Sequence, residues 1–377
     1  MTDLSHWTGA KVPDGRVLSG RTCRLERLDP ARHGDDLWAA VQNHDQLWDY
    51  LGYGPFADGA VFRAWLDSRA PLSDPYAYVV IDSQSDRALG VATLMEIRPA
   101  MGVIEVGHIF FSPELQRTPA ATEAIYLLAR HAFEDLGYRR FEWKCNAANA
   151  PSRRAALRFG FVYEGTFRQH MIVKGKSRDT AWFSITDNEW PYIEQAFSRW
   201  LAPGNFDARG AQKIALSAIN QREISVGSLV LTRMTGADRD AIEAFQEAAY
   251  ARNRAILGAE PLPLKWDYGT IFLGTEVWGV HDKDALVGLL ILRPGDDALR
   301  IESVATLPQV QGGGYGNAML NAAEFRARDW GFAAIRLLTG EKLTQNVEWY
   351  LRKGFHVETL ERLPDRSIVH MIKHLRD

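Results

Sequence analysis

The sequence predicts an α+β (α/β) fold that is built twice along the chain. In each half, several strand-like segments precede a loop, a long amphipathic helix, a further strand and a short helix, which is typical of a sheet with helices on both faces. The two loops, residues 116–121 and 311–316, lie about half the chain apart, and the helices after them end at Gly137 and Gly331. Solenoid units recur every ~20 to 50 residues, so a repeat this long indicates two whole domains.

Composition places the chain among ordinary globular proteins. At 377 residues it can hold roughly two to three domains of ~150 residues each, and the repeat selects two. Hydrophobic residues make up 46% and charged residues 24%, and 44 basic against 47 acidic residues give a net charge of -3. We therefore expect neither nucleic acid nor a membrane as a partner.

The cysteines and the N-terminus exclude other classes of protein. Cys23 and Cys145 are too few and too scattered for a disulfide framework or a zinc site, so we expect no metal and a reducing compartment. The chain has no basic N-terminal stretch followed by an apolar core, and no run approaches 18 apolar residues. A cytoplasmic location is the expectation, and the oligomeric state stays open.

The first half begins with a strand, because polar and apolar residues alternate over 21–28 before Asp29-Pro30. A helix is predicted over 123–136, where apolar residues recur at the spacing of one buried helical face. The remaining predicted elements are strands at 77–82, 89–97, 103–111, 140–145 and 181–185 and helices at 35–42, 59–68 and 152–158.

The second half repeats this order after a predicted linker. Residues 203–227 contain Pro203, Gly204 and Gly210, so we expect domains at 1–202 and 228–377. The predicted elements of the second half are strands at 229–234, 276–280, 285–292, 299–305 and 334–338 and helices at 237–257, 317–330 and 347–353.

The loop at 311–316 is a candidate anion site, since a glycine-rich loop before a helix brings unpaired N–H groups and the positive end of the helix dipole together. A P-loop is disfavoured, because Asn317-Ala318 stands where lysine and serine or threonine are needed. A dinucleotide fingerprint is disfavoured as well. The loop follows the fourth predicted strand of its half instead of the first, and Arg336 stands where an acidic residue is expected.

What remains is Gln-x-x-Gly-x-Gly after a fourth strand, with Tyr350 four residues before Gly354-Phe355. This pattern resembles the GNAT superfamily of N-acyltransferases, and the resemblance covers both halves. It implies two tandem GNAT-like acyl-CoA N-acyltransferase domains, each with a mixed, mostly antiparallel sheet with helices on both faces. It also implies acetyl-CoA as co-substrate, whose pyrophosphate the loop holds. The cofactor-binding residues implied in the second half are Gln311, Gly312, Gly313, Gly314, Tyr315, Gly316, Val304 and Asn346.

The loop of the first half departs from this pattern, because Pro119 and Ala121 occupy glycine positions. Proline in the first helical turn costs no hydrogen bond but removes one donor to a phosphate. The residues around the loop resemble the ribosomal-protein and amino-terminal acetyltransferase branch of the superfamily (RimJ/RimL type). We therefore expect a working loop, with a decayed one as the alternative. The cofactor-binding residues implied here are Gln116, Arg117, Thr118, Ala120, Ala121 and Asn149.

Direct acetyl transfer needs a neutral amine, a polarised thioester carbonyl and a proton for the departing thiolate. Tyr350 matches the family position of the acid that protonates the sulfur, although a buried packing role is the alternative. Glu302, on the strand before the loop, is the candidate base, and a solvated carboxylate is its alternative. The family likeness alone implies that backbone N–H groups near 304–306 and 110–112 hold the acyl carbonyl.

The first half has Ala156 where the second has Tyr350, so it needs a different acid. Ser152 matches the serine that the related branch places near the sulfur, and the alternative is that Ser152 caps the helix ending at Arg158. Glu105 and His108 are the base candidates. On a strand of period two they are expected to face opposite sides, and we favour Glu105 for the cleft.

The implied function is acetyl-CoA-dependent N-acetylation of a primary amine. The acceptor is a small-molecule amine or a protein N-terminus, and the aromatic stretches 48–56 and 264–268 suit an amine with an apolar body, unless they only anchor their loops. One alternative is a catalytic half, 228–377, with a regulatory or substrate-selecting first half. The other is a non-catalytic CoA-binding sensor or scaffold.

Overall fold

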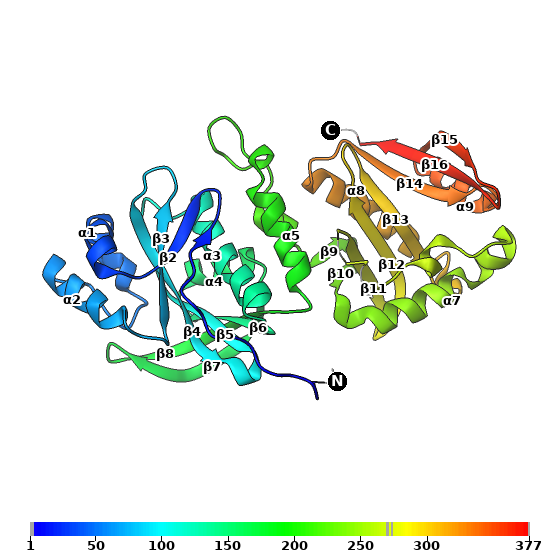
Figure 1. Ribbon diagram of the computed structural model, residues 1–377. Coiled ribbons are helices and arrows are strands. Elements are labelled where there is room, and N and C mark those ends of the chain that lie inside the picture. Colours follow the sequence, from blue (N-terminus) through cyan, green and yellow to red (C-terminus); the bar gives the residue numbers. More distant parts are fainter. Residues whose placement is uncertain (1–3, 269–270, 273, 376–377) are drawn as a thin grey trace. The chain divides into compact units, whose positions relative to one another are not determined.

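The computed structural model describes residues 4–268, 271–272 and 274–375. The chain divides into two compact units, Met1–Pro203 and Gly204–Asp377, and each contains one eight-stranded sheet with helices (Figure 1). Both sheets are antiparallel except for one parallel pair in each among the described strands. The predicted α+β fold with two mixed, mostly antiparallel sheets is therefore confirmed.

The first unit has the sheet order β1-β2-β3-β4-β5-β6-β8-β7. Helices α1 and α2 pack on one face of this sheet, where Leu37 and Phe62 contact Val79 and Val91. Helix α3 contacts β2 and β3 and packs against α5. The strands are β1 (Leu18–Ser19), β2 (Cys23–Arg27), β3 (Tyr76–Asp82), β4 (Ala88–Arg98), β5 (Val103–Phe111), β6 (Arg140–Asn146), β7 (Val162–Val173) and β8 (Lys176–Thr186), and the helices are α1 (Pro30–Val41), α2 (Gly59–Arg69), α3 (Pro119–Arg130), α4 (Ala150–Arg158) and α5 (Trp190–Leu201).

The second unit has the sheet order β15-β16-β14-β13-β12-β11-β10-β9. Helices α7 and α8 cover opposite faces, because Val277 and Leu289 pack in the α7 core while their neighbours Trp278 and Leu290 pack in the α8 core. The strands are β9 (Glu223–Val226), β10 (Leu229–Met234), β11 (Glu276–Asp282), β12 (Ala285–Pro294), β13 (Leu299–Thr306), β14 (Ala334–Gly340), β15 (His356–Arg362) and β16 (Ser367–His374), and the helices are α6 (Leu216–Ile219), α7 (Arg239–Leu257), α8 (Tyr315–Asp329) and α9 (Thr344–Arg352).

The parallel pair of each sheet is joined at one end only. Strands β13 and β14 pair over 299–301 and 335–337, and β5 and β6 pair over 103–106 and 140–143. Beyond these residues the two strands part, while β13 stays paired to β12 as far as Thr306. The parting leaves one edge of β13 without a strand partner.

The segment predicted as a linker, residues 203–227, contains α6 and β9 and packs as part of the second unit. Asn205 and Ile214 exchange two hydrogen bonds of 2.9 and 3.1 Å, which fold the segment back on itself. Whether it links independently folding domains stays a prediction. Among the residues searched, no helix is both long and apolar enough to cross a membrane.

A buried ion cluster anchors α8 in the second unit. Arg326 of α8 is fully buried and contacts Glu276 of β11 through Nη2 at 2.6 Å and Nε at 3.0 Å. Arg233 of β10 also reaches Glu276, at 3.1 Å, and Arg326 Nη1 donates to the Ala218 carbonyl of α6 at 2.7 Å. Helix α8 is thereby fixed to the sheet and to the segment before β9.

We expect Glu276→Ala to lower the free energy of unfolding of the second unit by about 3–5 kcal/mol, because it removes the buried carboxylate that Arg233 and Arg326 share. Arg326 keeps its ion pair with Asp329, at 3.3 Å. Calorimetric unfolding of the full chain measures this. Glu348→Ala is the matched control, because Glu348 forms an exposed pair with Arg352 that contributes at most about 1 kcal/mol. Equal effects of the two substitutions would contradict the anchoring role.

Candidate active site

A cavity of about 520 Å³ lies where β13 and β14 part, and we call it the β13–β14 cavity. Residues 302–306 of β13 and 338–340 of β14 line it, as do the loop before α8 and part of α9. Because these strand segments do not pair with each other, their backbone polar groups are available to a molecule in the cavity.

The loop before α8 presents free backbone donors. Gly314 is the N-cap of α8 and has no side chain to cap the helix. The N–H groups of Gly312 and of 314–317 donate to no backbone partner among the described residues. Gly312 and Gly314 both have φ of 88°, and a Cβ added to either would meet open space. These residues form a cradle for an anion at a helix N-terminus. Gln311, Gly312, Gly314 and Gly316 line the cavity.

Tyr350 of α9 belongs to the same site. Its side chain is buried, it lines the cavity, and its hydroxyl makes no hydrogen bond to another described residue. Burial raises the pKa of Tyr350 above its ordinary value, so the phenol keeps its proton at neutral pH. The ring is fixed by Trp349, 4.9 Å away between centroids, and by Phe355.

Glu302 lies at a β-bulge in β13. The register shifts so that Leu292 pairs with Ile301 and Ile291 with Ser303, which leaves Glu302 as the extra residue. Its carboxylate accepts a hydrogen bond from Arg293 Nε at 2.9 Å and lines the cavity. Glu302 was predicted from the sequence as the candidate base, and it lines the cavity, but the bulge at this position leaves no period-two signal.

Sequence analysis missed a second phenol, Tyr250 of α7. Tyr250 lines the cavity, its hydroxyl lies 3.0 Å from Ser303 Oγ, and burial raises its pKa. Gln246, one turn earlier, donates to the same serine at 3.3 Å. On a helix with one apolar face, these residues give no signal that separates them from core positions.

The loop of the first unit offers fewer donors. Thr118 is the N-cap of α3, and its hydroxyl accepts a hydrogen bond from the N–H of Ala121 at 3.2 Å. Pro119 has no N–H, and the Gln116 side chain donates to the Phe111 carbonyl at 2.8 Å. Three of the residues expected at the phosphates, Gln116, Thr118 and Ala121, are therefore engaged in local hydrogen bonds.

Helix α4 carries the other candidates of the first unit. The side chain of Asn149 caps α4 by accepting from the N–H of Ser152 at 3.0 Å, so the alternative that Ser152 is the cap is wrong. The hydroxyl of Ser152 accepts from Trp143 Nε1 at 3.0 Å. No hydrogen bond joins Ser152 to Glu105 within the described part of the chain.

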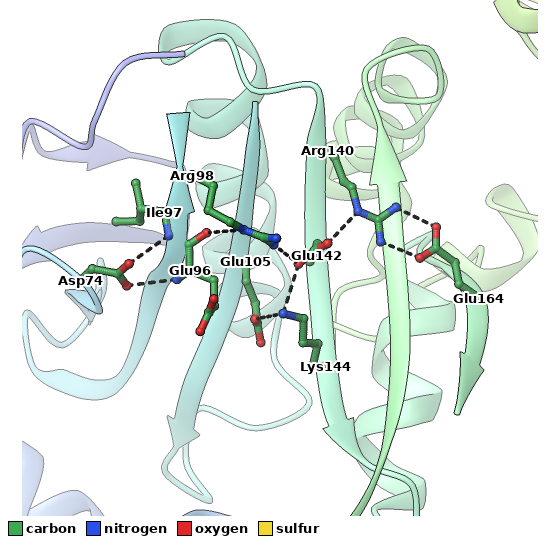
Figure 2. Close-up of polar contacts among 9 residues, drawn as sticks. All are labelled: Asp74, Glu96, Ile97, Arg98, Glu105, Arg140, Glu142, Lys144 and Glu164. Carbon is green, nitrogen blue, oxygen red and sulfur yellow. Dashed lines mark hydrogen bonds and ion pairs between the residues drawn. The ribbon is translucent and has the colours of Figure 1, made fainter. Parts of the chain in front are cut away.

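Glu105 lies in a network of charges across the sheet (Figure 2). Lys144 Nζ lies 2.9 Å from Glu105 and 3.2 Å from Glu142, and Arg98 and Arg140 also contact Glu142. Burial raises the pKa of Glu105 to about 7, although the neighbouring ammonium of Lys144 lowers it. Glu105 therefore forms an ion pair with Lys144. The sequence had predicted that Glu105 faces the cleft as the base for the amine.

The expectation that Glu105 and His108 face opposite sides of the strand is wrong. Glu105 pairs with Met95, Gly107 with Thr93, and Phe110 with Val91, so a bulge falls at 108–109, where His108 has φ of 47°. The extra residue at the bulge interrupts the period-two alternation of side chains, so Glu105 and His108 lie on one face of the strand. His108 stacks on Tyr53, with centroids 5.5 Å apart, and lines a cavity of about 30 Å³ that Val91 and Thr93 also line.

Comparisons with known proteins agree with this geometry. The acetyltransferase (GNAT) domain model matches residues 24–162, and the acetyltransferase (GNAT) family model matches residues 242–355. The solved structure of a GCN5-related N-acetyltransferase from Brucella melitensis is 48% identical, with a TM-score of 0.57, and the match covers 58% of this chain and 99% of that one. The chain belongs to the GNAT superfamily of N-acetyltransferases.

Two curated relatives are more distant. The ribosomal-protein-serine acetyltransferase of Escherichia coli (strain K12) is 30% identical over 94 residues, which cover 25% of this chain and 52% of that protein. An uncharacterized N-acetyltransferase, p20, of Bacillus licheniformis is 24% identical over 176 residues, which cover 45% of this chain and 94% of that protein. The resemblance of this GNAT chain to ribosomal-protein acetyltransferases is therefore confirmed.

The second GNAT domain brings most of its predicted site residues together. Glu302, Val304, Asn346 and Tyr350 line the β13–β14 cavity with four residues of the loop. Gly313 and Tyr315 are not among the lining residues, and the ring of Tyr315 packs against the α8 core instead.

We expect Lys144→Met to raise the pKa of Glu105 above its wild-type value near 7, because the substitution removes the charge that favours the carboxylate. Titration of carbon-13-labelled glutamate by NMR measures this pKa, and Glu105→Gln assigns the signal. Lys176→Met, on the exposed start of β8, is the control that should leave it unchanged. A lower or unchanged pKa in Lys144→Met would contradict the pairing.

The same pKa sets a pH dependence of stability. The folded-state pKa of about 7 lies above the ordinary 4.5, so the folded form binds this proton more tightly than the unfolded chain does. The contribution is fully present below about pH 4.5 and is lost as the pH rises through 7.

Proposed function

We propose that this chain is an acetyl-CoA-dependent N-acetyltransferase that transfers the acetyl group directly to a primary amine, with the second domain as its main catalytic site. One observation carries the proposal. The uncapped N-terminus of α8, the buried phenol of Tyr350 and the carboxylate of Glu302 all line the β13–β14 cavity. Transfer of the acetyl group from acetyl-CoA to an amine needs three features in one place: a site for the pyrophosphate, an acid for the sulfur and a base for the amine.

The residues present fit this co-substrate. When bound, acetyl-CoA supplies the activated thioester and a pyrophosphate. The free N–H groups of Gly312 and 314–317, with the dipole of α8, would hold the pyrophosphate, since no side chain competes for them. The unpaired edge of β13 near Val304 would donate to the acyl carbonyl, a role that rests on family likeness.

Two side chains would move the protons. Glu302 accepts a proton from the amine, directly or through a water, from its place at the bulge in β13. Tyr350 keeps its proton because burial raises its pKa, and it donates that proton to the sulfur as negative charge develops there.

For the first domain we propose a weaker acetyl-CoA site on the residues around Thr118 and Ala120. Its base is Glu105 or His108, which lie on one face, and Ser152 is the proposed acid. A protein N-terminus is one acceptor class for this domain, in line with the ribosomal-protein acetyltransferase that the chain resembles. The capped α3 favours the second candidate function, in which the first domain selects the substrate or regulates the second.

We expect Gly314→Asp to weaken acetyl-CoA binding to the second domain by at least tenfold, because its carboxylate would lie beside the bound phosphates. Gly314→Asn is the matched control, with nearly the same shape and no charge. Both substitutions place a side chain at the positive φ of residue 314, with similar strain, so the difference between them reports the charge. Calorimetric titration of the full chain with acetyl-CoA tests this.

The same titration counts sites. Wild type should show two sites per chain, and Gly314→Asp should leave the weaker one of the first domain. Wild-type affinity for acetyl-CoA in Gly314→Asp would contradict the proposed phosphate site at the N-terminus of α8. A single acetyl-CoA site in wild type would mean that the first domain does not bind acetyl-CoA.

We expect Tyr350→Phe to lower kcat roughly 100-fold to 10,000-fold, since the phenol acts only as the sulfur gains charge. Acetyl-CoA affinity should stay the same, because the ring still packs on Trp349 and Phe355. Single-turnover transfer from labelled acetyl-CoA isolates the chemical step. Tyr315→Phe is the control, and a single-digit effect of Tyr350→Phe would reduce this tyrosine to a packing role.

A further inference from the structure

The β13–β14 cavity has two charged lining residues among those that the structure describes, Glu302 and Arg366. They come from different elements. Glu302 lies at the bulge of β13, and Arg366 lies in the turn between β15 and β16, next to the end of β14. The cavity therefore presents one carboxylate and one guanidinium among neutral groups.

Arg366 is held in position from two sides. Its side chain is 12% exposed, and Nε lies 3.0 Å from Asp365 Oδ2, which Nη2 also contacts. Nη1 donates to the Glu260 carbonyl at 2.9 Å. Guanidinium has five N–H donors, so two remain for another acceptor after these three bonds. An arginine fixed in this way loses little further freedom when it binds a carboxylate.

One part of the lining of the same cavity is apolar. Leu257 ends α7, and the segment after it contributes Pro261, Leu262, Pro263 and Trp266 to the lining. A wall of this kind accommodates a hydrocarbon or aromatic body.

We infer that the acceptor of the second domain is a small amino acid, a primary amine that also carries a carboxylate, with an apolar side chain. The inference rests on the proposed function. The amine lies toward Glu302, Arg366 donates to the carboxylate, and the apolar wall contacts the side chain. A simple amine lacks the group that Arg366 would bind, and a peptide N-terminus lacks a carboxylate next to its amine.

The experiment compares matched acceptors with the full chain. L-Phenylalanine is paired with phenethylamine, and L-leucine with 3-methylbutylamine, so that each pair differs in the carboxylate. Thiol release from acetyl-CoA should give a kcat/KM at least about tenfold higher for each acid, because a hydrogen bond to a charged group contributes about that factor.

Substitutions assign this preference to Arg366. Arg366→Gln should lower kcat/KM for the acids at least about tenfold and leave the decarboxylated amines unchanged, while Arg366→Lys should restore part of the loss. Arg362→Gln, on the exposed end of β15, is the matched control. Acetyl-CoA titration shows whether Arg366→Gln is folded, and saturation-transfer NMR with L-phenylalanine alone should show binding to wild type and less to Arg366→Gln.

The outcomes separate the inference from the proposed function. Acetylation of amines without a preference for the acids, or an equal loss for acids and amines in Arg366→Gln, overturns the inference and leaves the function standing. Acid acetylation that Arg366→Gln leaves unchanged also overturns it, because the preference for the acids then does not depend on this guanidinium. No thiol release with any amine overturns the proposed function itself.

Discussion

The parting of β13 and β14 is the constraint on which the rest of the second domain depends. Backbone N–H and C=O groups in a sheet need hydrogen-bond partners. Strands β13 and β14 stop pairing with each other after three residue pairs. The opening is kept because β12 holds the other edge of β13, β16 holds the full length of β14, and the buried cluster of Arg326 and Glu276 fixes α8 to the sheet. The N-terminus of α8 therefore lies beside an opening lined by unpaired backbone. A ligand that carries an anionic group and further hydrogen-bonding groups can bind the helix N-terminus with the first and the unpaired strand backbone with the others.

The first domain repeats the parting with different side chains. Its parallel pair also ends early, and its strand also carries a bulge, but α3 is capped by Thr118 and begins with Pro119, so the same fold offers a poorer anion site. The polar groups near the split bind each other, as Lys144 does with Glu105. A shared fold thus fixes the place of a site, while a few side chains decide whether the backbone donors there are free.

Many strands of both sheets could be predicted from the sequence because periodicity reports burial directly. Strands β9, β15 and β16 were not predicted, and β15 is exposed at every position, so it carries no pattern of burial. Strands at 103–111 and 229–234 match β5 and β10. The loop was predicted from its run of glycines before a helix, and Gly312 and Gly314 have the positive φ that glycine adopts readily. Bulges leave no periodic signal, so the face of His108 was assigned wrongly. Tyr250 could not be predicted, because a tyrosine on an amphipathic helix is most often a core residue. Its hydroxyl contacts Ser303, which is distant in sequence. The fold of 203–227 depends on the buried Arg326, which local propensity does not report.

The lining of the cavity also bears on the route of transfer. A covalent route needs an activated nucleophile beside a base. Cys23 and Cys145 both lie in the first unit, where burial raises the pKa of each thiol. In the β13–β14 cavity the described lining residues include no cysteine, lysine or histidine, and the hydroxyl of Ser303 is bound by Gln246 and Tyr250. Among the described residues no hydrogen bond joins Ser303 to a carboxylate, so no base is positioned to take its proton. The lining therefore supports the proposed direct attack of the amine, with Glu302 as the proposed base and Tyr350 as the proposed acid.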